Sequence, residues 1–79
     1  MPPFPGRQYF GPGKHNAHIT TLGKQLVRKG YGKHYKNGPG PEWTDADRAN
    51  VRDLQLDHAK LKGDADGLPG PLTWQILFS

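Results

Sequence analysis

The stretch of sequence that decides the fold is Asp66-Gly67-Leu68-Pro69-Gly70-Pro71-Leu72-Thr73-Trp74-Gln75-Ile76-Leu77. Asp-Gly is a turn pair, because Asp can hydrogen-bond its own backbone and Gly adopts a positive φ without a Cβ clash. Pro71 suits the first position of a helix, where its missing N–H removes no hydrogen bond. Trp74, Leu77 and Phe78 share one helix face, since they recur at i, i+3 and i+4. The stretch therefore predicts a turn and then a short docked helix over residues 71–78.

This stretch, DG-xx-GP-x-TW, resembles the closing signature of the small helical peptidoglycan-binding modules found in bacterial and phage cell-wall hydrolases (endolysins). The resemblance continues upstream through Val51-Arg52-Asp53-Leu54-Gln55. Two further segments are similar to an actinobacterial and actinophage branch of the family, namely Phe4-Pro5-Gly6 with Tyr9-Phe10, and Gly38-Pro39-Gly40-Pro41-Glu42-Trp43-Thr44-Asp45-Ala46-Asp47-Arg48. Nearly the whole chain is covered. The resemblance implies a non-catalytic domain that binds peptidoglycan, both the stem peptide and the adjoining sugar.

The rest of the chain predicts two longer helices. Residues 17–29 carry apolar side chains at helical spacing, with Asn16 as the N-cap and Gly30 as the stop. Gly23 inside that helix indicates close packing against another helix. A second helix begins after Thr44, where an acidic first turn resembles a capping box, and we expect it to continue to about Lys62 and stop at Gly63.

The predicted architecture is an all-α, three-helix bundle with long ordered loops. Seventy-nine residues make one domain with a modest core. Residues 1–13 are rich in Pro and Gly and suit an arm or linker, followed by the three-helix domain over residues 14–79. Three aromatics, Phe4, Tyr9 and Phe10, lie inside the arm, so we expect it to pack on the body of the domain.

The loop over residues 30–43 is the main candidate for ligand binding. It has four Gly and two Pro interleaved with Tyr31, Tyr35 and Trp43, and long irregular loops in compact domains are usually functional or disordered. Aromatic faces pack on the C–H faces of sugars, and their polar groups donate directed hydrogen bonds. The alternative is that these aromatics form the core of a chain that is poor in aliphatic residues.

Polar candidates lie on the second helix and in the closing turn. The Gln55 amide could bind peptide bonds of the muropeptide, and Arg52 and Lys36 could meet stem-peptide carboxylates or wall phosphates. Asp66 could face the ligand. The alternatives are that Gln55 caps a solvent-facing turn and that residues 64–67 form only hydrogen-bonded turns.

Charge favours an anionic partner. The net charge is +4, with Lys24, Arg28, Lys29, Lys33 and Lys36 in the central stretch and most Asp residues in the later half, which indicates a dipolar surface. Nucleic acid and teichoic-acid-bearing wall both qualify. A helix-turn-helix protein would need a recognition helix with basic or amide residues, and the last helix has no basic residue, so nucleic acid is not the expected partner. A virion-structural or protein-interaction module of the same fold is the other alternative.

Catalysis, metals and cofactors are not expected. The four His residues lack ligand spacing, the 64–67 segment lacks the rest of a calcium loop, and no Cys is present. No nucleophile-base pair or paired-carboxylate cleft is indicated. We therefore expect a binding module without a cofactor, tethered to an upstream catalytic domain that could be a peptidoglycan hydrolase.

Location follows from the expected ligand. No apolar run approaches the ~20 residues that span a bilayer, and the N-terminus lacks the basic and apolar regions of a signal peptide. We expect a monomer without a membrane partner that acts on the cell wall, outside the cell, as a phage-derived protein or as part of a larger exported one.

Overall fold

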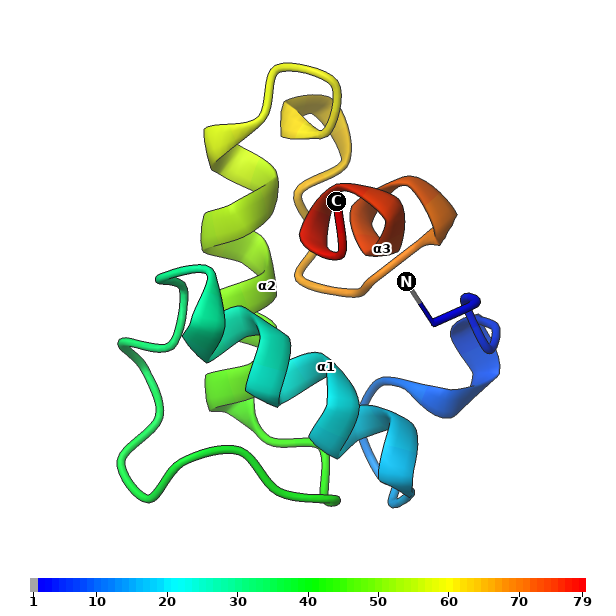
Figure 1. The fold of residues 1–79 in the computed structure, drawn as a ribbon, viewed down its shortest axis with the longest axis vertical. Coiled ribbons are helices and arrows are strands. Elements are labelled where there is room, and N and C mark those ends of the chain that lie inside the picture. Colours follow the sequence, from blue (N-terminus) through cyan, green and yellow to red (C-terminus); the bar gives the residue numbers. More distant parts are fainter. Residues whose placement is uncertain (1) are drawn as a thin grey trace.

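Three α-helices and two short 3-10 helices make up the computed structural model, which describes residues 2–79 (Figure 1). In chain order they are η1 (Arg7–Tyr9), α1 (Ala17–Arg28), α2 (Asp45–Asp57), η2 (Lys62–Asp64) and α3 (Pro71–Leu77). Over this described range there is no strand, and an isolated bridge joins His15 to Glu42. The predicted all-α, three-helix class is confirmed.

Helix α1 begins and ends where its sequence predicts. The Asn16 side chain accepts the backbone N–H of His18 at 3.0 Å, which satisfies one of the free donors at a helix start. At the other end Gly30 has φ 90°, a conformation that costs Gly little and that stops the helix. Ile19, Leu22 and Leu26 form its buried face.

Helix α2 starts as predicted but ends earlier. Thr44 and Asp47 form a reciprocal capping box, as its sequence indicates. The prediction of a helix to Lys62 is wrong, because His58 is extended (φ −116°, ψ 122°) and the chain turns there. The Leu61 N–H donates to the His58 carbonyl at 2.9 Å, and Leu61 is buried beside the turn, outside the central core.

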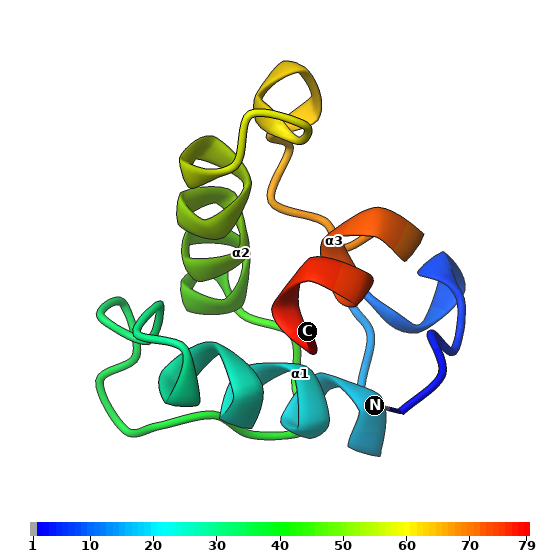
Figure 2. The same cartoon turned by 45° about the horizontal axis from the view of Figure 1, so that its top comes forward.

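Helix α3 follows the closing turn and docks across the other two helices (Figures 1 and 2). Gly67 has the predicted positive φ, 81°, and Pro71 occupies the first turn. Trp74 and Leu77 are buried, and the Trp74 and Phe78 rings lie 4.5 Å apart. The predicted helix and its apolar face are confirmed.

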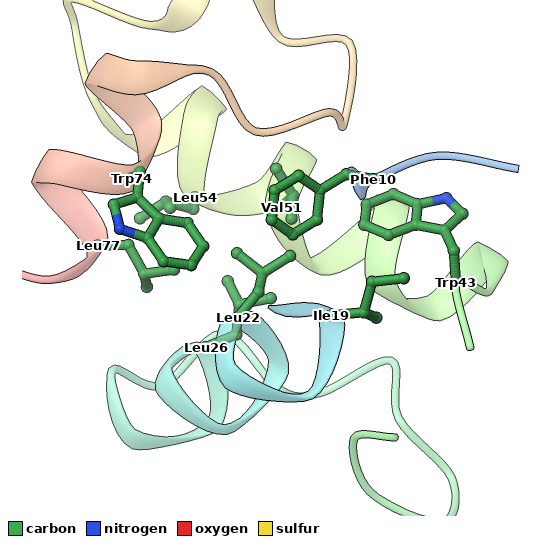
Figure 3. Packing of buried hydrophobic residues seen from close by; sticks show 9 residues of the cluster. All are labelled: Phe10, Ile19, Leu22, Leu26, Trp43, Val51, Leu54, Trp74 and Leu77. Atoms are coloured by element: carbon green, nitrogen blue, oxygen red, sulfur yellow. The ribbon is translucent and has the colours of Figure 1, made fainter. Parts of the chain in front are cut away.

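The core joins all three helices and two segments outside them (Figure 3). Helices α1, α2 and α3 contribute aliphatic side chains and Trp74, while Trp43 enters from the loop before α2 and Phe10 from the N-terminal arm. The buried cluster consists of Phe10, Ile19, Leu22, Leu26, Trp43, Val51, Leu54, Trp74 and Leu77. Aromatic residues fill much of this volume, which suits a small domain with few aliphatic residues.

The N-terminal arm packs on the body, as its aromatics predict. Phe10 is buried, and Phe4 stacks on it with centroids 6.1 Å apart. The Trp74 indole donates to the Pro2 carbonyl at 2.8 Å, and the Asn16 amide donates to the Tyr9 carbonyl at 2.8 Å. Met1, the first residue of the predicted arm, lies outside the described residues. Phe10 and Phe4 of the arm therefore pack in the same core as the side chains of residues 14–79.

Gly23 is in close contact, but the prediction of a helix as its neighbour is wrong. A Cβ at Gly23 would overlap the ring of Pro39 and lie 2.9 Å from the Tyr35 hydroxyl. Both neighbours belong to the loop over residues 30–43, hereafter the aromatic loop. Gly23 thus lets the aromatic loop lie directly against α1. None of the helices within residues 2–79 is long and apolar enough to cross a membrane.

Candidate functional site

The aromatic loop is ordered because one face of α2 holds it. Four α2 side chains, spaced by three, three and four residues, accept hydrogen bonds from the loop, and this spacing places them on one helix face. They are Asp47, Asn50, Asp53 and Asp57, which pair respectively with the Tyr35 hydroxyl, the His34 N–H, the His34 ring and the Tyr31 hydroxyl. The acidic composition of α2 therefore has a structural use in this domain.

The Tyr35–Asp47 contact links the aromatic loop to the start of α2. The half-buried Tyr35 hydroxyl donates to Asp47 Oδ1 at 2.6 Å, while Asp47 Oδ2 accepts the Thr44 backbone N–H at 2.7 Å. Burial, followed by the hydrogen bond and the negative charge of Asp47, raises the pKa of Tyr35 well above its ordinary value. The phenol therefore stays protonated and remains a donor.

Of the four α2 side chains that hold the loop, Asp53 and Asp57 are more open to solvent than Asp47 and Asn50. The Tyr31 hydroxyl donates to Asp57 Oδ2 at 2.9 Å, and burial together with the Asp57 carboxylate raises the Tyr31 pKa. His34 Nε2 lies 2.9 Å from Asp53 Oδ2, and the Lys33 ammonium lies 3.7 Å from the same oxygen. These contacts fix the loop near the C-terminal half of α2.

The far end of the aromatic loop is fixed to the chain before α1. The Asn16 N–H donates to the Pro41 carbonyl at 2.9 Å, and the Trp43 N–H donates to the Lys14 carbonyl at 3.1 Å. Hydrogen bonds thus hold both ends and the middle of the loop. An open groove lies between the loop and the first turns of α2.

This groove, hereafter the loop groove, has a volume of about 610 Å³. Residues from the loop form one wall, and Thr44 with the first turns of α2 forms the other. The lining residues are His34, Tyr35, Lys36, Asn37, Gly38, Gly40, Pro41, Glu42, Thr44, Asp45, Ala46, Asp47 and Ala49. The groove thus combines an aromatic side chain and small apolar side chains with one Lys and several carboxylates.

The six predicted site residues do not come together. Tyr35 alone of the six lines the loop groove. Tyr31 borders a separate hollow with Lys33 and Asp53. Trp43 is a core residue with 7% of its surface exposed, so the prediction that it offers a face to a ligand is not met in this structure.

Gln55 is buried and fully occupied by internal contacts. Its carbonyl oxygen accepts the Gly67 N–H at 2.9 Å, and its amide donates to the Leu68 carbonyl at 2.9 Å and to the Thr73 hydroxyl at 3.3 Å. The hydrogen-bonding groups of Gln55 are therefore used by the chain itself, where they cap the closing turn, whose Asp66 and Leu68 are exposed and whose Gly67 is buried.

Asp66 and Arg52 lie near the same connection. Asp66 Oδ1 accepts the Leu68 N–H at 2.9 Å, which confirms the predicted hydrogen-bonded turn, and Arg52 Nε donates to the Ala65 carbonyl at 3.2 Å. Both side chains are exposed. Asp66 and Gln55 border a second hollow of about 260 Å³ that Arg7 and Lys60 also line, whereas Arg52 does not.

Two residues of the loop groove, Glu42 and Asp45, were not among the residues expected from the sequence. They flank Thr44, the N-cap of α2. The capping-box pattern in the sequence could have identified them. It locates the first turn of α2 directly after the loop, so residues of that turn border any groove beside the loop.

No metal centre is assembled within residues 2–79, where His, Asp and Glu side chains form no group of three with the geometry to hold an ion. The His18 ring contacts the Tyr9 ring at 4.7 Å, and His15 bridges Glu42 through the backbone. His15 and His18 thus have packing and backbone roles.

Comparisons of this chain with protein-family models, with curated proteins and with solved structures gave no match. The chemistry of the loop groove is therefore the main structural basis for a functional proposal.

Proposed function

We propose that this domain is a non-catalytic cell-wall-binding module that recognises peptidoglycan, through the stem peptide and the adjoining sugar, and targets a tethered lytic enzyme to the wall. The observation that carries the proposal is the loop groove, whose lining brings together Tyr35, Lys36 and the two exposed carboxylates of Glu42 and Asp45. The resemblance of the DG-xx-GP-x-TW segment to peptidoglycan-binding modules supports the choice of ligand.

The size and lining of the loop groove suit part of a muropeptide. Ligand pockets usually have volumes of roughly 300 to 1,000 Å³, and the loop groove has about 610 Å³. The side chain of Tyr35, together with Ala46 and Ala49, offers apolar contacts for sugar C–H groups and for peptide methyl groups.

Charge in the loop groove suits a ligand with both signs. A stem peptide has free carboxylates and, at its diamino acid, an ammonium group. Lys36 can bind the carboxylate, while Glu42 and Asp45 can bind the ammonium. Glu42 and Asp45 are exposed, so their charges are available to a ligand.

A modest affinity suffices for such a module. When a binding domain is tethered to an enzyme, each binding event raises the local concentration of the enzyme at an insoluble substrate. The arm over residues 2–13 would then join the domain to the upstream catalytic domain, with Phe10 fixed in the core and Phe4 packed against it.

The second candidate is a virion-structural or protein-interaction module of the same fold without wall binding. The observation that favours it is the burial of Trp43 and Gln55, because two expected ligand contacts serve packing instead. The two candidates differ in one property, which is whether the loop groove binds muropeptides.

Amide-resolved NMR titration with soluble muropeptides tests the proposal. The expected result is a set of shifts confined to residues 34–49. A Gly40→Trp variant should lose the shifts, since a Cβ at Gly40 meets nothing within 4 Å and its side chain can occupy the groove. The matched control is Gly63→Trp, which is equally unobstructed but lies outside the groove. No shifts in the folded parent protein would support the interaction module.

A further inference from the structure

The net positive charge is concentrated in one half of the chain. Residues 1–41 contain seven Lys and Arg residues and no Asp or Glu, whereas residues 42–79 contain four Lys and Arg against seven acidic residues. Helix α1 lies in the first half, and α2 and the connection to α3 lie in the second. A segregation of this kind produces a field that attracts polyanions to one face.

The outward face of α1 is the helical part of this basic half. Ala17, Thr21, Lys24 and Arg28 follow each other at spacings of four, three and four residues, and all four are exposed. The ion pairs of residues 2–79 join Lys33 and His34 to Asp53. Lys24 and Arg28 are outside these pairs, so their charges are not neutralised by a neighbouring carboxylate.

Most acidic residues lie away from this face, and the exception is Glu42, which forms a backbone bridge with His15 near the start of α1. In both ribbon views α1 lies in the lower half of the molecule beside the aromatic loop, and the turn after α2, which includes η2, lies at the top (Figures 1 and 2). Asp64 and Asp66 belong to that distant connection, and Asp47, Asp53 and Asp57 are engaged by the aromatic loop.

Hydrogen-bond donors accompany the charges on α1. A shallow hollow of about 560 Å³ lies beside Lys24, and it is lined by His15, Asn16, Ala17, Thr20, Thr21, Lys24 and Pro41. The Thr20 hydroxyl and the Lys24 ammonium can both donate to phosphate oxygens, whereas the Thr21 hydroxyl donates to the Ala17 carbonyl at 3.2 Å. The hollow and the stripe that ends at Arg28 form one continuous surface, hereafter the α1 face.

We propose that the α1 face binds a flexible polyol-phosphate polymer, the chemistry of teichoic acids, as a contact distinct from the loop groove. Phosphodiester groups along such a polymer would meet Lys24 and Arg28 in turn, with hydroxyl contacts in the hollow. None of the α1 residues of the stripe lines the loop groove, and Pro41 is the residue that borders both surfaces.

Nucleic acid suits the α1 face less well. The aromatic loop lies against α1, since Pro39 covers Gly23 and Pro41 borders the hollow, so the loop stands beside the face that would have to enter the major groove of a duplex. Single strands are usually held by bases stacked on aromatic side chains. Between Thr21 and Arg28 the sequence has no aromatic residue.

Fluorescence anisotropy with labelled poly(glycerol phosphate) at low salt tests the proposal. We expect Lys24→Glu/Arg28→Glu to weaken binding by about tenfold or more, and raising the salt to weaken binding of the parent protein. The matched control is Lys60→Glu/Lys62→Glu, which changes the net charge equally near the acidic connection, and we expect a loss below about threefold. Both doubles alter exposed side chains, and urea unfolding checks that they fold.

Several outcomes would overturn the proposal. Equal weakening by the two double variants would mean that binding follows net charge alone. Binding of a 20-nucleotide oligo-dT as tight as that of poly(glycerol phosphate) would contradict the choice of polymer. If Lys24→Glu/Arg28→Glu fails to fold, Lys24→Gln/Arg28→Gln replaces it, and unchanged binding by this neutral variant would contradict the proposal. Because the probe contains no peptidoglycan, failure here is distinct from failure of the loop groove.

Discussion

The side-chain carbonyl of Gln55 accepts the backbone N–H of Gly67 at 2.9 Å inside the domain. The same amide donates to the carbonyl of Leu68, the next residue, so one side chain satisfies a donor and an acceptor of the closing turn. A buried loop needs such partners, because its own backbone forms no ladder. The pairing of Gln55 with the DG-xx-GP stretch is thus a structural link between α2 and the start of α3.

Replacing Gln55 should destabilise the fold. In Gln55→Leu the Gly67 N–H and the Leu68 carbonyl lose their partner, and unpaired buried groups cost about 1–3 kcal/mol each. We expect a loss of about 2–4 kcal/mol in the free energy of urea unfolding. The control is Gln75→Leu at an exposed position of α3, with an expected change within about 0.5 kcal/mol. Equal stability of the two variants would refute the structural role of Gln55.

Gly23→Ala should destabilise the protein although Ala favours helices. The new methyl group overlaps Pro39 and approaches the Tyr35 hydroxyl to 2.9 Å, so the aromatic loop must move. Overpacking usually costs about 1–3 kcal/mol, which exceeds the ~1 kcal/mol gained in helix propensity. The control is Gly63→Ala, whose Cβ meets nothing within 4 Å. Thermal unfolding should show a lower Tm for Gly23→Ala only.

Trp43→Ala should remove much of the stability of the domain. Trp43 is 7% exposed and contacts Phe10 with ring centroids 6.3 Å apart, and truncation of a buried aromatic costs about 3–5 kcal/mol. An exposed apolar residue, Leu72 with 40% exposure, provides the control in Leu72→Ala. A well-folded Trp43→Ala domain in near-UV circular dichroism would show that the core does not depend on this residue.

The stability of the domain should fall at alkaline pH, with Tyr35 as a main contributor. Its pKa is raised in the folded state, whereas in the unfolded chain it is about 10. Above pH ~10 the unfolded chain therefore loses this proton while the folded domain keeps it, so unfolding becomes easier as pH rises. Below pH ~10 both states are protonated, and Tyr35 adds no pH dependence there.

Tyr35→Phe separates this effect from the rest of the protein. The variant lacks the hydroxyl that donates to Asp47, so it should be less stable at neutral pH by about 1–3 kcal/mol. Its stability should also fall less steeply than that of the parent protein between pH 9 and 11 in urea unfolding. Parallel curves for the two proteins over that interval would contradict the assignment to Tyr35.

The helix starts could be predicted from the sequence because their signals are local. Asn16 and Thr44 bond to residues two or three positions away, so each cap lies within a short stretch of sequence. The turn at Gly67 and the helix at Pro71 are equally local. The aromatics of the arm could be predicted to pack, although their partners, such as Trp74, are distant in the chain.

The end of α2 and the membership of the site could not be predicted, because both depend on contacts between distant residues. The apolar spacing up to Leu61 is compatible with a continued helix. The turn at His58 depends instead on which segments of the folded domain lie close enough to bury Leu61. Gln and Trp are residue types that occur both in ligand-binding sites and in cores, so the types of Gln55 and Trp43 do not decide between the two. Their burial follows from the docking of α3 and of the aromatic loop.

Cosedimentation of the purified domain with actinobacterial sacculi stripped of teichoic acid tests the central claim most directly, because stripping leaves peptidoglycan as the ligand. We predict that the parent protein and Gly63→Trp pellet with the stripped sacculi at moderate salt, while a folded Gly40→Trp variant stays in the supernatant. Parent protein that remains in the supernatant with stripped sacculi would contradict peptidoglycan recognition.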